Sequence, residues 1–166
     1  MRKTIIGVMG PGNGATETDL QNAYQLGRLI AKNYWVLLTG GRNAGVMDAA
    51  SNGAKDANGL TLGILPSDRP VNLSDAVDIA IVTGMGSARN QINVLSSDVV
   101  IACGIGAGTL SEIALALKAN KRAILLNNNP KSHEFLKMLS PETVFAVDTP
   151  EAAIARVKQI LSDSHI

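Results

Sequence analysis

The feature that most constrains the fold is the apolar run Val99–Cys103, which is followed directly by a glycine-rich turn. A short run that is apolar at every position predicts a strand buried on both faces, as in a parallel sheet. The turn contains Gly104, Gly106 and Gly108 and leads into a predicted apolar helix. A strand, a glycine turn and a helix start together present free backbone N–H groups and the positive end of the helix dipole. This stretch is therefore a candidate anion site, although a tight turn that binds no ligand has the same pattern.

The same alternation of apolar runs and helical patterns extends along the whole chain. Strands are predicted at residues 4–9, 35–39, 60–65, 79–83, 99–103, 123–126 and 143–147, with helical patterns between them. Continuously apolar strands that alternate with helices predict an α/β fold. We expect a Rossmann-like, doubly wound, mostly parallel sheet of about seven strands with helices on both faces. The 166 residues fit one ligand-binding domain, residues 1–166, because no linker or repeat divides them.

Composition narrows the class of partner. Lys and Arg are scattered, the net charge is +1 and only 3% of residues are aromatic, so nucleic acid is not an expected partner. No apolar run approaches the roughly 20 residues of a membrane span, and the short run at residues 4–9 does not predict a signal peptide. Cys103 is the only cysteine, which suits a reducing compartment and predicts a cytoplasmic protein.

Four of the predicted strands end in a glycine turn, at Gly10, Gly40, Gly84 and Gly104. In a parallel sheet these turns all emerge at the carboxyl edge, where ligands bind in folds of this kind. Four such turns predict a cleft lined by backbone and suited to a phosphate-bearing, anionic small molecule. Arg42 and Arg89 lie in two of the turns, where they would neutralise the anion unless they are solvated surface arginines.

Several sharper motifs are incomplete. Residues 10–15 have the spacing of a dinucleotide fingerprint, but no acidic residue follows the second strand to hold a ribose, although Arg42 suits a 2′-phosphate. His133 and His165 have no partner at metal-ligand spacing, so no metal site is predicted. Cys103 and Met9 lie near the turns, where core packing explains them more simply than ligand contact.

Taken together, the turns resemble the superfamily formerly labelled lysine decarboxylase-like, which contains nucleoside-monophosphate phosphoribohydrolases (the LOG proteins) and molybdenum cofactor carrier proteins. Three stretches carry the resemblance: Gly40-Gly-Arg-Asn-Ala-Gly45-Val-Met47, Arg89-Asn90 and Gly104-Ile-Gly-Ala-Gly-Thr-Leu-Ser-Glu112. The hydrolases have an Arg-Lys pair and a Pro-Gly-Gly loop at the last two. The resemblance implies that Arg89 and Glu112 match their catalytic pair, whereas Asn90 replaces the lysine and Gly104-Ile105 replaces the Pro-Gly.

The stretches 84–104 and 106–116 resemble the carrier branch more closely. The favoured hypothesis is therefore a binding and carrier protein for molybdenum cofactor, with no catalytic residues. The alternatives are a phosphoribohydrolase that uses Arg89 and Glu112, and a nucleotide-sensing module. The resemblance further implies a homo-oligomer, dimer or tetramer, and molybdoenzymes as recipients of the cofactor.

The turns and the resemblance together give the candidate binding residues. They are Gly10, Pro11, Gly12, Asn13, Gly40, Gly41, Arg42, Gly45, Met47, Ser87, Arg89, Asn90, Gly104, Ile105, Gly106, Ala107, Gly108, Thr109 and Glu112.

Overall fold

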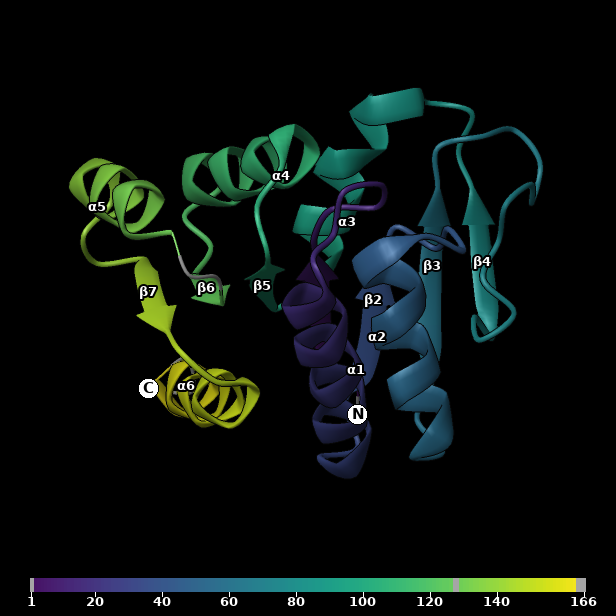
Figure 1. Cartoon of the computed structure of the whole chain (residues 1–166), viewed down its shortest axis with the longest axis horizontal. Coiled ribbons are helices and arrows are strands. Elements are labelled where there is room, and N and C mark those ends of the chain that lie inside the picture. Colours follow the sequence, from purple (N-terminus) through teal and green to yellow (C-terminus); the bar gives the residue numbers. More distant parts are fainter. Residues whose placement is uncertain (1, 127–128, 164–166) are drawn as a thin grey trace.

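The computed structural model describes residues 2–126 and 129–163 as a seven-stranded parallel sheet flanked by helices (Figure 1). The strands are β1 (Ile5–Met9), β2 (Val36–Thr39), β3 (Thr61–Leu65), β4 (Ile79–Val82), β5 (Val99–Cys103), β6 (Ala123–Leu126) and β7 (Val144–Val147). The α-helices are α1 (Glu17–Lys32), α2 (Gly45–Asp56), α3 (Asn90–Ser96), α4 (Ala107–Lys118), α5 (Pro130–Leu139) and α6 (Pro150–Asp163), and a 3-10 helix, η1, spans Gly86–Arg89. The predicted α/β class is confirmed.

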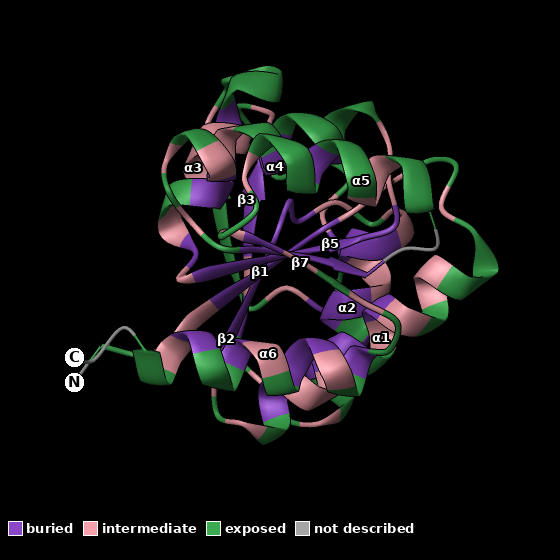
Figure 2. Ribbon diagram, turned by 90° about the vertical axis from the view of Figure 1, so that its left-hand side faces the viewer, coloured by how far each residue is buried: buried purple, intermediate pink, exposed green. Residues whose placement is uncertain are grey.

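The strand order is β4-β3-β2-β1-β5-β6-β7, and every pair is parallel. The chain builds outward from β1 to β4, then returns to the other side of β1 and builds outward again from β5. Figure 2 shows the result end-on, with α3, α4 and α5 over one face of the sheet and α1, α2 and α6 over the other. The strand order therefore reverses between β1 and β5, which is the position where doubly wound sheets bind ligands.

Two helical glycines let α1 and α2 pack closely on their side of the sheet. A Cβ atom at Gly27 would lie 2.7 Å from the backbone nitrogen of Ala54, and one at Gly53 would lie 2.8 Å from the carbonyl carbon of Tyr24. Glycine lowers helix propensity by about 1 kcal/mol relative to alanine. The close approach of the two backbones explains why glycine stands at these positions.

The edge strand β4 differs from the prediction that the apolar strands are buried on both faces. Ile79, Ile81 and Val82 are 47%, 44% and 45% exposed, whereas all the residues of β5 are buried. The reason is topological: β4 lies at the edge of the sheet and pairs only with β3. The sequence of β4 is typical of a strand in the centre of a sheet, but β4 lies at the edge.

Local signals fix the ends of α1. Thr16 is the N-cap: its hydroxyl accepts a hydrogen bond from the backbone N–H of Asp19, whose carboxylate accepts one from the backbone N–H of Thr16. Asn33 ends the helix. Within the described residues, no helix combines the length and the apolar character that crossing a membrane requires.

Candidate functional site

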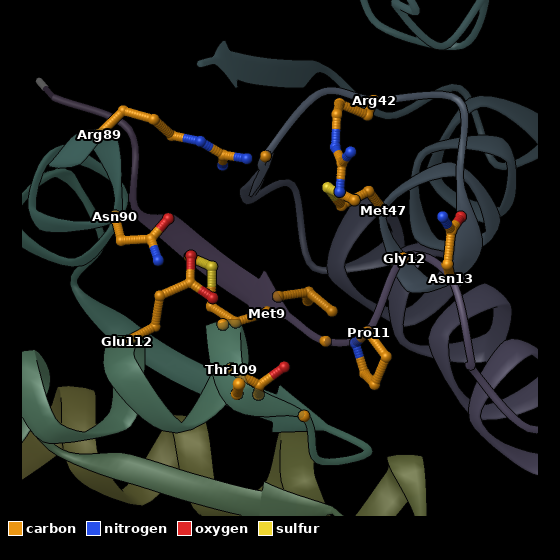
Figure 3. Close-up of a pocket in the computed structure, with 16 residues that line it drawn as sticks. Met9, Pro11, Gly12, Asn13, Arg42, Met47, Arg89, Asn90, Thr109 and Glu112 are labelled. Atoms are coloured by element: carbon orange, nitrogen blue, oxygen red, sulfur yellow. The ribbon is translucent and has the colours of Figure 1, made fainter. Parts of the chain in front are cut away.

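A pocket of about 330 Å³ opens at the carboxyl edge of the sheet, at the end of β1. This volume lies at the lower end of the range found for small-molecule sites, about 300–1,000 Å³. The pocket is formed by the turns after β1 and β2, by the η1–α3 junction and by the start of α4 (Figure 3). Its lining consists of Val8, Met9, Gly10, Pro11, Gly12, Asn13, Gly40, Arg42, Met47, Arg89, Asn90, Gly106, Ala107, Gly108, Thr109 and Glu112.

The start of α4 contributes backbone donors. Gly106 is its N-cap and has no side chain, so no side-chain hydrogen bond caps the helix. The first N–H groups of a helix have no partner within the helix, and here those of Ala107, Gly108 and Thr109 lie in the pocket wall. The Thr109 hydroxyl is buried and has no hydrogen-bond partner among the described residues. This wall is suited to receive an anion.

Arg89 is held in the pocket by the shape of the β2 turn. It is only 7% exposed, and its Nε has no partner in the described part of the chain. A Cβ atom at Gly40 would lie 2.8 Å from Arg89 Nη2 and 2.7 Å from Met47 Sδ, and still closer to Arg89 Nη1. The missing side chain of Gly40 therefore provides the space that the guanidinium occupies.

Arg42 enters from the opposite side of the pocket mouth (Figure 3). A Cβ atom at Gly12 would lie 3.0 Å from Arg42 Nη2, and among the described residues Arg42 Nε is also buried without a partner. The loop between β3 and β4 anchors the backbone of Arg42 through an antiparallel bridge to Leu73. The N–H of Asn43 donates to the carbonyl of Asn72 at 2.8 Å, on the same loop.

Glu112 is the one carboxylate of the pocket lining, one turn into α4. It is 6% exposed, and Oε1 accepts a hydrogen bond of 2.8 Å from Nδ2 of Asn93, which is fully buried on α3. Burial raises the pKa of Glu112, and the Asn93 hydrogen bond and the charge of Arg89 oppose this rise. Burial likewise lowers the pKa of Arg89, against the attraction of Glu112. The two groups attract one another but are not within ion-pair distance in the described structure.

This architecture and this pocket have relatives of known sequence and structure. The model of the SLOG cluster4 family matches residues 3–154, most of the chain. The chain belongs to the SLOG cluster4 family. An uncharacterised protein of Archaeoglobus fulgidus is 48% identical over 126 residues, which are 76% of this chain and 82% of that protein. A cytokinin riboside 5′-monophosphate phosphoribohydrolase of Mycobacterium tuberculosis is 35% identical over 97 residues, 57% of this chain and 51% of that enzyme.

Two solved structures extend the similarity over nearly the full length. The molybdenum cofactor binding protein of the phototrophic bacterium Rippkaea orientalis is 66% identical, with a TM-score of 0.96 over 97% of this chain and 99% of that one. The molybdenum cofactor carrier protein of Chlamydomonas reinhardtii is 51% identical, with a TM-score of 0.92 and the same coverage. The resemblance to the carrier branch, inferred from sequence motifs, is therefore confirmed.

In this SLOG cluster4 protein most of the candidate residues meet in one pocket, and five of them lie outside it. Gly41 packs against Gly63, and Gly45 packs against the carbonyls of Pro11 and Gly12. Both have a positive φ, so glycine there serves the turn. Ser87 is exposed on η1.

The remaining two, Gly104 and Ile105, line a neighbouring pocket of about 370 Å³. Gly104 has a φ of 76°, and a Cβ atom there would lie 2.7 Å from the carboxyl carbon of Asp19. The chain thus turns toward α1 before it enters α4, and only the residues from Gly106 onward reach the first pocket.

Sequence reasoning did not assign Val8 and Met9 to the site, although both line the pocket. They belong to a strand, and nothing in an apolar strand marks which side chains lie beneath a pocket. Cys103, by contrast, is fully buried in the core, where burial and the charge of Asp19 raise its pKa to about 12. No group of three or more acidic, histidine or cysteine side chains suited to a metal ion occurs among residues 2–126 and 129–163.

Proposed function

We propose that this protein binds molybdenum cofactor in the pocket at the carboxyl end of β1 and carries it. The cofactor is a pterin with a dithiolene-held metal and a terminal phosphate, so it presents anionic groups at both ends. The solved structures similar to this chain at 66% and 51% identity are described as molybdenum cofactor binding and carrier proteins.

The observation that carries the proposal is a set of buried donors without acceptors. Arg89 Nε and Arg42 Nε have no hydrogen-bond partner among the described residues, and the unpaired Thr109 hydroxyl faces the same pocket. Leaving a buried polar group unpaired costs about 1–3 kcal/mol, and more when the group is charged. A bound anion removes this cost for several groups at once, because the arginines and the α4 amides all donate to it.

The test is retention of cofactor through gel filtration. The protein is incubated with freshly extracted molybdenum cofactor and passed through the column, and the protein peak is assayed for oxidised-pterin fluorescence. We expect stoichiometric retention by the wild type and at least a tenfold loss for Arg89→Ala. Arg69→Ala is the matched control, because it removes the same charge from an exposed site outside the pocket. Retention no better than that of an unrelated protein would end the proposal.

The phosphoribohydrolase alternative has one observation in its favour, namely that Arg89 and Glu112 line the same pocket. Against it, Asn90 stands where the hydrolases have lysine, and its amide donates to the Ser111 hydroxyl at 2.8 Å. Incubation with AMP separates the two functions: release of adenine that disappears in Glu112→Ala would establish the hydrolase.

We further propose a cytoplasmic homo-oligomer, dimer or tetramer, that passes its ligand to molybdoenzymes. The buried, unpaired Cys103 and the exposed apolar side chains of β4 support the reducing compartment and the self-association. Light scattering coupled to gel filtration measures the oligomeric state, and activation of an apo-molybdoenzyme by the loaded protein measures the transfer.

A further inference from the structure

One carboxyl group stands in a pocket whose charged side chains are otherwise both arginines. The pocket lining offers the α4 amides, the Thr109 hydroxyl and two guanidinium groups, and Figure 3 shows the Glu112 carboxyl group pointing into the same space. An ionised carboxylate beside a bound anion is repelled by it, and in a buried site the repulsion is poorly screened. The position of Glu112 therefore needs an explanation that fits anion binding.

The hydrogen bond from Asn93 indicates how the carboxyl group is used. Nδ2 of Asn93 donates to Oε1 of Glu112 at 2.8 Å, and Asn93 is fully buried, so this oxygen is held as an acceptor. The second oxygen has no hydrogen bond from the described residues. If it carries a proton, the carboxyl group accepts from Asn93 through one oxygen and donates into the pocket through the other.

We propose that Glu112 binds the ligand's anion as a neutral carboxyl group, which donates its proton to an anion oxygen while Asn93 holds the other oxygen. Above the pKa of Glu112 in the free protein the proton comes from the solvent, so binding of a fully ionised anion there takes up as much as one proton per site. The inference rests on the proposed function in one respect, because it assumes that the ligand of this pocket is anionic.

The charged surroundings are consistent with this role. Of the residues that line the pocket, the only other charged ones are Arg89, at the end of η1, and Arg42, on the turn after β2. β1 contributes Val8 and Met9, and α3 contributes the neutral Asn90. Burial raises the pKa of Glu112 despite Arg89 and Asn93, and the negative charge of a bound anion raises it further. Binding and protonation therefore reinforce one another.

One consequence distinguishes this role from a structural one, and a second follows from the burial of Glu112 alone. Anion affinity falls as the pH rises above the pKa of Glu112 in the free protein, by up to tenfold per pH unit for one linked proton. The stability of the free protein changes with pH in the same direction, because folding raises the pKa of Glu112. The contribution of Glu112 to the free energy of unfolding is complete below the unfolded pKa, near 4.5, and is lost as the pH rises through the folded pKa.

The experiment uses sulfate as the probe, because its charge stays constant from pH 5 to pH 9. The rise in melting temperature with sodium sulfate, against sodium chloride of equal ionic strength, measures binding at each pH. Arg89→Ala gives the non-specific salt effect for subtraction. We expect a sulfate shift that declines with pH in the wild type and a flat shift in Glu112→Gln, whose amide donates a hydrogen bond but does not titrate.

Asn93→Leu tests the positioning role. Removing the donor to Oε1 removes an interaction that favours the ionised form, so the midpoint of the pH profile moves to higher pH. A purely structural asparagine would lower the melting temperature without moving that midpoint. An unmoved midpoint would contradict the role of Asn93.

The same pH series is repeated with extracted molybdenum cofactor in the gel-filtration assay. If cofactor is not retained but the sulfate shift declines with pH in the wild type alone, the proposed function fails and the role of Glu112 stands. If Glu112→Gln has the same pH profile as the wild type, or if neither probe binds, the role of Glu112 is refuted.

Discussion

Replacing Gly40 by alanine separates ligand binding from folding in this protein. The new Cβ would lie 2.8 Å from Arg89 Nη2 and 2.7 Å from Met47 Sδ, and closer still to Arg89 Nη1. Ordinary contacts to a Cβ begin near 3.4 Å, so both side chains must move. Both Arg89 atoms are the far end of a flexible side chain, Met47 Sδ is one bond from the end of another, and Gly40 has no positive φ, so we expect the fold to accommodate the methyl group at little cost. The guanidinium, however, leaves the position from which it faces the pocket.

The size of the binding loss follows from the interaction removed. A hydrogen bond to a charged group contributes about 1.5–3 kcal/mol, which corresponds to about a ten- to 150-fold weaker affinity. Titrating a fixed amount of extracted cofactor with Gly40→Ala and with wild type, using the gel-filtration fluorescence assay, measures this ratio. The melting temperature of the variant should stay within a few degrees of the wild type.

A double-mutant cycle decides whether the effect passes through Arg89. In the background of Arg89→Ala, the Gly40→Ala change should weaken binding by less than about twofold, because the group that it displaces is already gone. Wild-type affinity in Gly40→Ala, or full additivity of the two changes, would refute the assignment of Arg89 to the ligand.

Three further predictions concern the fold. Gly27→Ala places a methyl group against the backbone of α2, so urea unfolding should show a loss of about 1–3 kcal/mol in stability. Stability equal to that of the wild type would contradict the close packing of α1 and α2. Lys121→Met removes a cation whose Nζ donates to the carbonyls of Leu95 and Ser97 at the end of α3, and a loss of about 1 kcal/mol should appear in the same measurement. Cys103 should resist iodoacetamide at pH 8 until urea unfolds the chain, because its side chain is fully buried and its pKa is raised to about 12. Rapid labelling of the native protein would instead show that the carboxyl end of β5 opens.

The sequence predicts the elements of this fold well because its strands are short and apolar, and four of them end at a glycine. Residues 99–103 and 123–126 are predicted and observed as strands with the same bounds. What it does not predict is which strand ends up at an edge. Ile79–Val82 is as apolar as β5, yet it pairs with β3 alone and stays exposed, because the order of strands depends on contacts distant in sequence.

In the candidate site, too, the sequence does not predict the features that depend on contacts between residues distant in the chain. Glycine turns and parallel strands suffice to place Gly10, Gly40 and Gly106 at one pocket, since the carboxyl edge is a property of the whole sheet. The glycine turns do not predict that the chain at Gly104 lies against Asp19, because this contact depends on where α1 begins relative to β5. Nor does local sequence reveal the Asn93–Glu112 hydrogen bond, which joins two helices 19 residues apart in the chain.

The charge state of Glu112 bears on which of the two candidate functions, carrier or phosphoribohydrolase, the pocket favours. A glutamate that stabilises an oxocarbenium ion must be ionised, because its negative charge is what lowers the barrier. Here burial favours the neutral form of Glu112, and Asn90, which stands where the related hydrolases have lysine, adds no positive charge to those of Arg89 and Arg42. A neutral Glu112 lacks the negative charge for that role, and in the proposal above it instead donates a hydrogen bond to the ligand's anion. If Glu112 is neutral when the ligand binds, as proposed, a rise in pH that ionises it weakens the hold on an anionic ligand, and release by alkaline buffer in the gel-filtration assay tests this link.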